Sequence, residues 1–320
     1  MKISVLGCGR WGSFIAWYLN RNGHDVTSFG IKEDPYVLEF FKTRTNNYVT
    51  FPDSIKLTTD LAEALNASEV IIISISSQHL REFMKKVTNI PGHETKNYVL
   101  CMKGIENTTG KRLSEVMIES GINKNNVAVW VGPGHIQEFT RGVPNLMIID
   151  SHNKILSKYL IENFKSDLIR YYQGDDIIGT EIGAAAKNVM GIAAGMLDGG
   201  GFTSLKGALI ARGAREVARL IKAAGGNELS AYGLCHIGDY EATLFSEHSH
   251  NRKFGELFVK NEQFDKLAEG VPTSLALLRL AEKLGVEMPI TKAVYSIVYE
   301  NKEPMDTLLS LFARTNLNEF

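Results

Sequence analysis

The chain has 320 residues, 44% of them hydrophobic and 22% charged, which is typical of a folded protein of about two domains. Its 35 basic and 36 acidic side chains give a net charge of -1, which argues against a nucleic-acid partner and favours a small metabolite. The three cysteines have no CxxC spacing, and the chain shows neither a signal-peptide pattern nor an apolar run of the ~18 residues that a bilayer requires. We therefore expect a reduced, cytoplasmic protein with no metal site and no membrane insertion.

Short apolar runs alternate with helical patterns in the first half of the chain. The runs predict strands at 3–6, 25–29, 55–57, 69–75, 98–102, 127–131, 146–149 and 168–172. Helical patterns lie between them at 12–21, 61–66, 79–87 and 113–120. Because Val70-Ile71-Ile72-Ile73 is apolar on both faces, this alternation predicts a Rossmann-type, doubly wound parallel sheet with right-handed crossovers.

The pattern changes after about residue 174, beyond which no convincing strand follows. Helical patterns occupy 179–196, 205–224, 230–233 and onward, 273–284 and 291–300. The polar, glycine-containing segment 172–176 marks the boundary between the part with alternating strands and helices and the part with helices alone. We predict an α/β domain at 1–174 and an all-helical C-terminal domain at 175–320.

Gly7-Cys8-Gly9-Arg10-Trp11-Gly12 matches G-x-G-x-x-G, directly after the first predicted strand and at the start of a helix. In this motif Gly7 permits the tight turn, Gly9 lets a pyrophosphate approach the backbone, and Gly12 lets the helix pack on the strand. A glycine-rich turn without a ligand is the alternative. The context favours an NAD(P)-binding domain at 1–174.

The end of the second strand selects the dinucleotide. NAD-binding proteins usually carry an acidic residue there, whereas this chain reads Phe29-Gly30-Ile31-Lys32. The missing acid and Lys32 favour NADPH, although Glu33 and Asp34 could reach the ribose, so NADH stays possible. A solvated loop lysine is the alternative interpretation of Lys32.

Lys187 is the one charged residue in a tract of small and apolar residues at 182–197. Its helical neighbours include Gly183, Ala184 and Gly191, which would let a backbone or ligand approach closely. A lysine on such a face is partly desolvated, which suits proton transfer; a lysine that snorkels to water is the alternative. Asn188, beside it, could bond a substrate hydroxyl.

Further polar residues follow predicted strands or interrupt apolar helices. Lys103 and the Gly132-Pro133-Gly134-His135 segment follow two strands at the sheet edge where ligands bind, although His135 could simply start a helix. Asp239 could hold a lysine or cap a helix. The cluster at 248–253 suits a phosphate, or is an exposed basic loop.

Taken in order, these motifs resemble the NAD(P)-dependent glycerol-3-phosphate dehydrogenases of bacteria, nearly end to end. The resemblance rests on the Gly7–Gly12 loop, Lys103-Gly104-Ile105-Glu106, Gly132-Pro133, Ala186-Lys187-Asn188-Val189, Gly238-Asp239, Ser249-x-Asn251-Arg252-Lys253-Phe254-Gly255, Glu269-Gly270 and Gly285-Val286-Glu287-Met288-Pro289-Ile290. It implies reduction of a phosphorylated ketone, dihydroxyacetone phosphate, to sn-glycerol 3-phosphate for glycerophospholipid synthesis. It also implies a homodimer with the active site in a cleft between the domains.

The resemblance assigns roles residue by residue. Lys187 looks like the general acid/base, with Lys103 and Asp239 as the other catalytic residues. The implied substrate-binding residues are Lys103, Gly132, Gly134, Lys187, Asn188, Asp239, Thr243, Ser249, His250 and Asn251. The implied cofactor-binding residues are Gly7, Gly9, Arg10, Trp11, Gly12, Lys32, Lys103, Ile136, His250, Leu267 and Glu269.

The chain departs from the family pattern at three places. The family's Ser-Arg-Asn reads Ser249-His250-Asn251, Gly134-His135-Ile136 replaces a hydroxyl-bearing segment, and Ile31 replaces a frequent histidine. Loss of the arginine removes a permanent bidentate phosphate donor. The alternatives are therefore a reductase of another small hydroxyketone, or a nucleotide-binding protein of the same fold without turnover.

Overall fold

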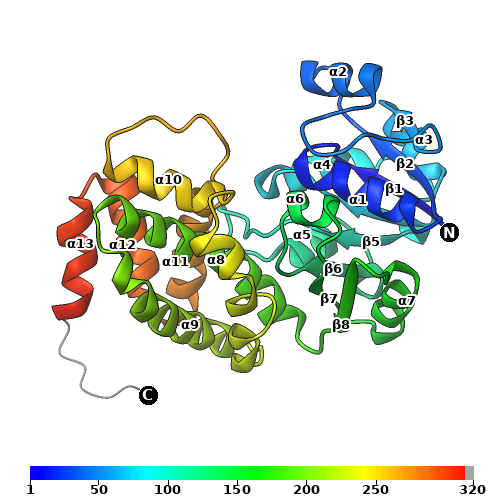
Figure 1. Ribbon diagram of the computed structural model, residues 1–320. Coiled ribbons are helices and arrows are strands. Elements are labelled where there is room, and N and C mark those ends of the chain that lie inside the picture. Colours follow the sequence, from blue (N-terminus) through cyan, green and yellow to red (C-terminus); the bar gives the residue numbers. More distant parts are fainter. Residues whose placement is uncertain (314–320) are drawn as a thin grey trace. The chain divides into compact units, whose positions relative to one another are not determined.

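The computed structural model describes residues 1–313, so the last part of the predicted helical domain, 314–320, lies outside the described residues (Figure 1). The chain folds as two compact units. The first comprises Met1–Met102 and Arg112–Ile177, and the second comprises Lys103–Lys111 and the chain from Ile178 onward. The segment Lys103–Lys111 thus belongs to the second unit, although elements of the first unit precede and follow it in the sequence.

The first unit is built on an eight-stranded sheet of order β3-β2-β1-β4-β5-β6-β7-β8 (Figure 1). Its strands are β1 (Lys2–Leu6), β2 (Asp25–Phe29), β3 (Lys56–Thr58), β4 (Val70–Ile73), β5 (Asn97–Leu100), β6 (Val127–Val131), β7 (Asn145–Ser151) and β8 (Ile169–Gln173). All eight predicted strands are confirmed, with ends displaced by a few residues at most. The side chains of β4 are fully buried, as expected of a strand covered on both faces.

The predicted parallel sheet is confirmed except at one pair of strands. Every other neighbouring pair runs parallel, but β6 and β7 are antiparallel, with Trp130 opposite Ile149. The connection between them carries only the short helix α6 (Ile136–Thr140). A helix of this length cannot return the chain along the sheet, as a parallel crossover requires.

Helices connect most of the strands of the first unit. They are α1 (Arg10–Arg21), α2 (Pro35–Thr43), α3 (Leu61–Asn66), η1 (Ser77–His79), α4 (Leu80–Val87), η2 (His93–Thr95), α5 (Leu113–Glu119), η3 (Lys124–Asn126), α6 and α7 (Lys154–Phe164). Helices α2 and α7 lie outside the predicted helical patterns, although both carry start signals. Asp34 accepts a hydrogen bond from the Tyr36 N–H, and Asn153 caps α7 in the same way.

The second unit contains no strand among its described residues. Its helices are α8 (Ile177–Gly199), η4 (Thr203–Leu205), α9 (Lys206–Ala223), η5 (Glu228–Tyr232), η6 (Ile237–Asp239), the π-helical turn η7 (Glu241–Phe245), α10 (His250–Val259), α11 (Gly270–Leu284), α12 (Pro289–Glu300), α13 (Pro304–Ser310) and η8 (Leu311–Ala313). The helix expected from residue 230 onward is wrong, because the chain there forms the short turns η5, η6 and η7. Gly233 adopts an extended backbone and ends η5, which breaks any continuous helix.

Helix α8 lies buried in the second unit, and its glycines decide what packs against it. A Cβ on Gly195 would lie 1.9 Å from the Arg252 carbonyl oxygen, and one on Gly255 would lie 2.1 Å from that of Ile192. The backbones of α8 and α10 therefore touch. Gly191, one of the small neighbours of Lys187, also admits another segment closely, because a Cβ there would lie 2.8 Å from Thr243 Cγ2.

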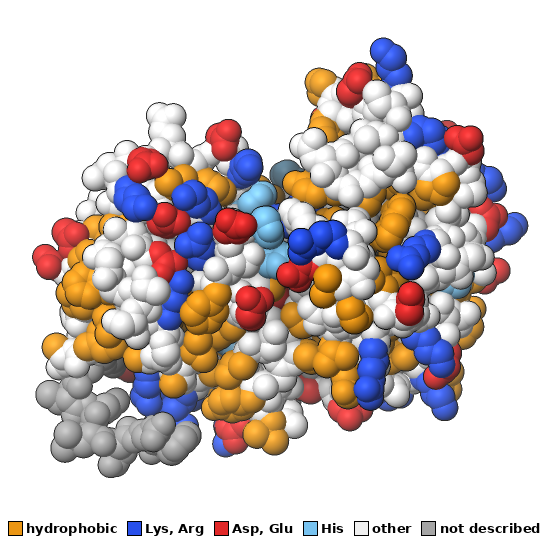
Figure 2. Space-filling view, viewed as in Figure 1, with side chains coloured by type: hydrophobic (Ala, Val, Ile, Leu, Met, Phe, Trp, Pro, Cys, Tyr) orange, Lys and Arg blue, Asp and Glu red, His pale blue; other side chains and the backbone are white. Residues whose placement is uncertain are grey.

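The surface drawn in Figure 2 shows basic and acidic side chains interspersed, with hydrophobic side chains exposed between them. Within residues 1–313, no helix combines the length and the apolar character that a membrane crossing demands. All three cysteines are buried free thiols.

Candidate functional site

The glycine motif of the first unit occupies the turn from β1 to α1. Gly7 has a φ of +107°, and a Cβ there would lie 2.3 Å from the Ser74 carbonyl oxygen. A Cβ on Gly12 would lie 1.9 Å from the Gly7 carbonyl oxygen, whereas one on Gly9 would meet no atom within 4 Å. The protein itself therefore requires the first and third glycines, and the second leaves open space beside the backbone, as a bound pyrophosphate would need.

The N-terminus of α1 points its free N–H groups and positive dipole end toward this turn. Its N-cap residue is Gly9, which offers no side-chain acceptor to those N–H groups. These features fit the phosphates of a dinucleotide. The Arg10 guanidinium, predicted to contact the cofactor, donates to Gln137 at 3.4 Å and lies over the Tyr48 ring. Trp11 packs against Phe14 and Phe139, with ring centroids 5.2 and 6.4 Å away.

A cavity of about 470 Å³ lies at the end of β2, where a Rossmann unit holds the adenosine ribose. Its lining residues are Phe29, Ile31, Lys32, Glu33, Thr59, Asp60, Leu61, Phe83 and Lys86. Lys32 Nζ is 4.0 Å from Glu33, and both side chains are mostly exposed. Asp60 Oδ1 caps α3 by accepting the N–H groups of Ala62 and Glu63 at 2.8 and 3.1 Å. Phe83 and Lys86 are not among the predicted cofactor residues, because they lie on α4, far from the glycine motif in the sequence.

The segment after β6 has the backbone that its glycines predict. Gly132 and Gly134 have φ values of +135° and +146°, and a Cβ on Gly134 would lie 2.3 Å from the Phe139 ring. His135 occupies the N-cap position of α6, so it does start a helix. Ile136, implied as a cofactor contact, is only 1% exposed and packs in the core of the first unit.

The second unit brings the three residues implied as catalytic onto one carboxylate oxygen. Asp239 Oδ2 lies 2.6 Å from Lys187 Nζ and 2.7 Å from Lys103 Nζ. Thr243 Oγ1 accepts a further hydrogen bond from Lys187 Nζ at 2.9 Å. The Asp239 side chain is 1% exposed, that of Lys187 9% and that of Lys103 18%. Lys187 therefore does not snorkel to water, and Asp239 holds two lysines rather than capping a helix.

Burial tunes Lys187 for proton exchange. The pKa of Lys187 falls from its usual 10.5 to about 7, mainly because burial removes water from the ammonium. Asp239 opposes this fall by stabilising the ammonium, and the nearby charge of Lys103 adds to it. Ammonium and amine are therefore both populated near neutral pH. A group in this state can donate a proton to, or remove one from, a bound oxygen.

Three different elements place this cluster. Lys187 comes from the middle of α8, Lys103 from the segment that joins the second unit after β5, and Asp239 from the end of η6. Thr243 lies on the π-helical turn, a geometry that is frequent at functional sites. The close approach of η6 to α8 depends on Gly183, where a Cβ would lie 3.1 Å from the His236 Cβ.

A chain of amides connects this cluster to the start of two helices. Asn188 Nδ2 donates to the Lys103 carbonyl oxygen at 2.9 Å, and Asn251 Nδ2 donates to Asn188 Oδ1 at 3.0 Å. The Gly270 N–H in turn donates to Asn251 Oδ1 at 2.9 Å. Asn188 and Asn251, both implied as substrate residues, are thus held rigidly next to Lys103.

The predicted phosphate residues lie at the N-terminus of α10, not in a loop. Ser249 caps this helix by accepting the Arg252 N–H, and His250 and Asn251 form its first turn. His250 Nδ1 is 3.3 Å from the Leu267 carbonyl oxygen. Leu267 is 59% exposed, and Glu269 is the N-cap residue of α11. The four residues Ser249, His250, Asn251 and Leu267 are therefore near neighbours.

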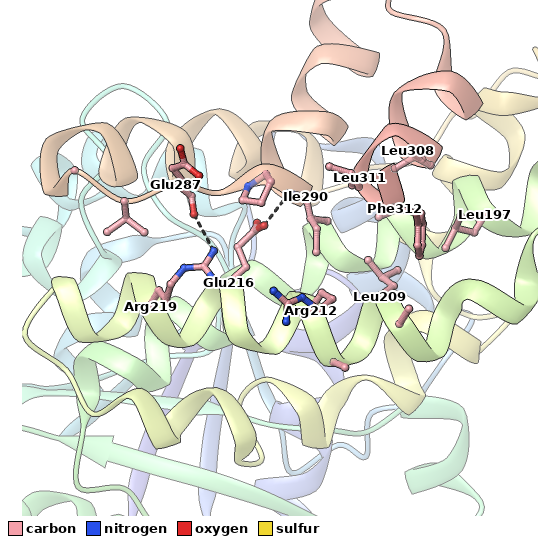
Figure 3. Close-up of a pocket in the computed structure, with 16 residues that line it drawn as sticks. Leu197, Leu209, Arg212, Glu216, Arg219, Glu287, Ile290, Leu308, Leu311 and Phe312 are labelled. Atoms are coloured by element: carbon pink, nitrogen blue, oxygen red, sulfur yellow. Dashed lines mark hydrogen bonds between the residues drawn. The ribbon is translucent and has the colours of Figure 1, made fainter. Parts of the chain in front are cut away.

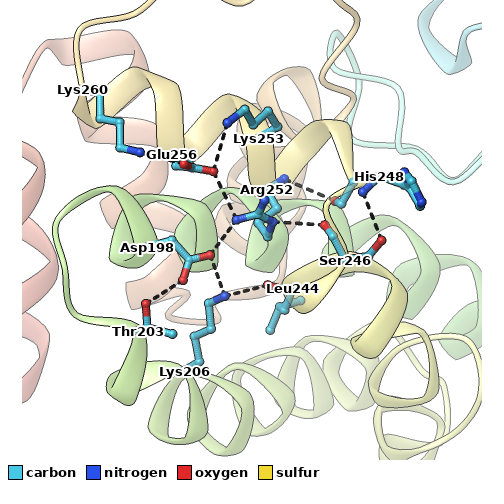
Figure 4. A network of polar contacts seen from close by, with 11 residues as sticks. Asp198, Thr203, Lys206, Leu244, Ser246, His248, Arg252, Lys253, Glu256 and Lys260 are labelled. Carbon is cyan, nitrogen blue, oxygen red and sulfur yellow. Dashed lines mark hydrogen bonds and ion pairs between the residues drawn. The ribbon is translucent and has the colours of Figure 1, made fainter.

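Arg252, which is next to the predicted phosphate residues, is committed elsewhere (Figure 4). Its Nη1 lies 2.9 Å from Asp198 and 3.2 Å from Glu256, and its Nε donates to the Ser246 carbonyl oxygen at 3.0 Å. Lys206 shares Asp198 Oδ2 at 2.6 Å. This network fixes α10 to α8 and α9, and it leaves Arg252 unsuited to replace the arginine of the family pattern.

A second cavity, of about 920 Å³, lies apart from the lysine cluster, among α9, α12 and α13 (Figure 3). Its walls are mostly apolar and include Leu209, Ile290 and Leu308. Buried Glu216 in its wall accepts the Ile290 and Thr291 N–H groups at 2.7 and 3.0 Å and so caps α12. Burial raises the pKa of this carboxyl, which the three hydrogen bonds it accepts partly offset.

A sheet unit with a dinucleotide turn, joined to a helical unit with two lysines on one buried carboxylate, defines a nicotinamide-dependent dehydrogenase. The chain belongs to the NAD-dependent glycerol-3-phosphate dehydrogenase family. Residues 2–157 match the N-terminal part of that family and residues 176–309 its C-terminal part.

Individual relatives agree with this assignment. The glycerol-3-phosphate dehydrogenase [NAD(P)+] of Prosthecochloris aestuarii is 38% identical, with 98% of each chain covered. That of a Thermoanaerobacter species is 37% identical over 100% of this chain and 99% of its own. The crystal structure of glycerol-3-phosphate dehydrogenase from Coxiella burnetii superposes with a TM-score of 0.88 at 30% identity, covering 98% of this chain and 99% of that one.

Proposed function

We propose that this chain reduces dihydroxyacetone phosphate to sn-glycerol 3-phosphate, and catalyses the reverse oxidation, with Lys187 as the proton donor and acceptor. One observation carries the proposal: Lys187 and Lys103 share Asp239 Oδ2 at 2.6 and 2.7 Å in a buried site. A nicotinamide cofactor, whose phosphates would be held by the turn at Gly7 and Gly9 and the N-terminus of α1, would supply or accept the hydride. The remaining chemistry is proton transfer and charge stabilisation, which the chain's own side chains supply.

In the reduction, Lys187 gives one proton from Nζ to the substrate oxygen as that oxygen becomes an alkoxide. Lys103, still charged, stabilises the developing negative charge because its ammonium is next to Lys187 on the same carboxylate. Asp239 keeps the two ammonium groups together and raises the proton affinity of Lys187. In the oxidation, neutral Lys187 removes the proton from the substrate hydroxyl.

We assign the substrate phosphate to the first turn of α10. Ser249, His250 and Asn251 lie there, and the positive end of the helix favours an anion. Since Arg252 is bound to Asp198 and Glu256, His250 is the side chain that stands where the family carries its arginine. Gly132, Gly134 and Thr243 stay predictions as substrate contacts.

We also propose that NADPH is preferred to NADH. The cavity at the end of β2 carries Lys32 and Lys86 as candidate partners of a 2′-phosphate, and no acid ends β2 itself. Glu33, paired with Lys32 at 4.0 Å, is the acid that a ribose 2′-hydroxyl would use instead. Leu267 and Glu269 stay predicted cofactor contacts. Action as a cytoplasmic homodimer in glycerophospholipid synthesis is part of this proposal and is supported by the family alone.

The experiment is a substrate panel with NADPH and with NADH. Absorbance of the reduced nicotinamide is followed with dihydroxyacetone phosphate, dihydroxyacetone, glyceraldehyde 3-phosphate and 2-oxo acids, and the product of each reaction is identified chemically. Fastest turnover with dihydroxyacetone phosphate, giving sn-glycerol 3-phosphate, supports the proposal. Faster turnover of an unphosphorylated ketone would instead support the alternative substrate that His250 suggests.

A further inference from the structure

The residues on either side of Asp239 bind each other. Tyr240 Oη lies 2.6 Å from His236 Nε2, and the two rings meet edge to face with centroids 4.7 Å apart. His236 Nδ1 lies 2.9 Å from the Gly183 carbonyl oxygen. His236 is 0% exposed and Tyr240 is 3% exposed, so water does not compete for these bonds. Neither residue belongs to the motifs that define the family resemblance.

The hydrogen bonds fix the proton positions of this pair. A carbonyl oxygen only accepts, so His236 Nδ1 carries the proton and Nε2 accepts the Tyr240 hydroxyl. Burial lowers the pKa of His236 to about 4 and raises that of Tyr240 well above its usual value. Both side chains are therefore neutral near pH 7, and they act by position rather than by charge.

The pair of His236 and Tyr240 connects η6, the segment that carries Asp239, to α8, the helix that carries Lys187. In an α-helix the carbonyl of residue 183 faces the N–H of residue 187, so His236 binds α8 one turn before Lys187. Gly183 permits this contact, because a Cβ there would lie 3.0 Å from Cys235 Sγ and 3.1 Å from the His236 Cβ. Tyr240, which directly follows Asp239 in the sequence, binds His236 through its hydroxyl, so residues before and after Asp239 are joined by one hydrogen bond.

We propose that His236 and Tyr240 are positioning residues that hold Asp239 Oδ2 at the distance from Lys187 and Lys103 that the proton transfer requires. This inference rests on the proposed function and adds two residues to it. Neither side chain is assigned a contact with substrate. The charged and polar groups that face Lys187 are Asp239 from η6, Lys103 from the segment after β5 and Thr243 from the π-helical turn, with His236 neutral beside them.

Removal of the Tyr240 hydroxyl should let Asp239 move, so that its carboxylate stabilises the Lys187 ammonium less strongly. In Tyr240→Phe we expect the midpoint of the Lys187 titration to move to lower pH by about half to one unit. At a fixed pH above that midpoint, the rate of the reduction should then fall by about 3- to 10-fold. The KM for dihydroxyacetone phosphate should change less than about twofold, because no substrate contact is lost. In His236→Asn the amide N–H can still donate to the Gly183 carbonyl oxygen, but no atom takes the place of Nε2 as the acceptor for Tyr240. This variant should therefore shift the Lys187 titration by a similar amount.

The experiment uses two readouts on the full chain. The first is the titration of the Lys187 ε-carbon, followed by NMR on protein labelled with ¹³C-lysine and assigned by its loss in Lys187→Met. The second is kcat for dihydroxyacetone phosphate reduction against pH. Tyr18→Phe is the matched control, because it also deletes a buried hydroxyl, one bonded to Ser166 in the first unit. This control should lower the melting temperature and leave the Lys187 titration unchanged.

The outcomes separate the two proposals. Equal shifts in Tyr240→Phe and His236→Asn that do not add in the double variant support the positioning role, because both break one bond. A lowered melting temperature with an unshifted Lys187 titration would overturn it, and so would shifts that add. If the wild-type chain fails to reduce dihydroxyacetone phosphate, the proposed function falls, while the NMR titration still decides the role of His236 and Tyr240.

Discussion

Asp239→Asn tests how the buried carboxylate sets the chemistry of Lys187. The substitution keeps the shape of the side chain and removes the charge that lies 2.6 Å from Lys187 Nζ and 2.7 Å from Lys103 Nζ. Without it, desolvation and the Lys103 charge act on Lys187 unopposed. An opposite charge at such a distance shifts a pKa by about 1–3 units, so that of Lys187 should fall from about 7 to between about 4 and 6.

The consequence for the reaction follows from the protonated fraction of Lys187. Reduction needs the ammonium form, so at pH 7.5 its kcat should fall by about 10- to 1,000-fold, with partial recovery toward acid pH. The assay is kcat for dihydroxyacetone phosphate reduction from pH 5.5 to 9 at saturating substrates.

Asp198→Asn is the control, because Asp198 also joins two cations on one oxygen, Lys206 at 2.6 Å and Arg252 at 2.9 Å. It should lower stability and leave the pH of half-maximal kcat unchanged. If Asp239→Asn loses activity equally at every pH, or keeps the wild-type profile, Asp239 does not set the protonation of Lys187.

Three further predictions concern the cofactor, the substrate phosphate and acid stability. Lys32→Ala should reduce kcat/KM for NADPH about tenfold more than it reduces kcat/KM for NADH. Glu33→Ala should leave kcat/KM for NADPH unchanged. A preference of the wild-type protein for NADH would show instead that Glu33 reaches the ribose. His250→Arg should lower the KM for dihydroxyacetone phosphate, because a guanidinium binds a phosphate through two parallel N–H groups. An unchanged KM in His250→Arg would remove His250 from the phosphate site. The pKa of His236 is about 4 in the folded protein, against the usual 6.5, so as the pH falls the unfolded chain binds a proton before the folded one does. The free energy of unfolding should therefore keep its full value above pH 6.5 and fall by roughly 3 kcal/mol between pH 6.5 and pH 4. Urea denaturation of wild type and His236→Asn measures this loss, which the variant should lack; an equal loss in both would refute it.

The sequence predicted the central strands well because β4 and β6 are short, apolar, fully buried runs. Val70-Ile71-Ile72-Ile73 is the clearest case, and it lies in the middle of the sheet. The direction of β7 could not be predicted in this way, since a strand pattern carries no information about its orientation. The missed helices α2 and α7 begin with capped turns at Asp34 and Asn153, signals that a search for hydrophobic periodicity alone overlooks.

The site was predictable in its charged residues and not in its geometry. Lys187 stood out as a lone charge among small residues, and Asp239 as a carboxylate in an apolar stretch. That both lysines meet a single oxygen depends on η6 and the π-helical turn, irregular segments that no periodicity describes. The ion pair of Arg252 with Asp198 likewise depends on the crossing of α8 and α10 at glycines.

The most direct measurement compares dihydroxyacetone phosphate reduction by wild type and Lys187→Met, with cofactor affinity measured on the same samples. A general acid contributes about 10²- to 10⁴-fold, so the variant should bind the nicotinamide cofactor normally and lose turnover by at least about a hundredfold. The variant should also be folded, because methionine fills the buried space of the lysine without its charge. Turnover in Lys187→Met above about a tenth of the wild-type rate would contradict the assignment of Lys187 as the proton donor.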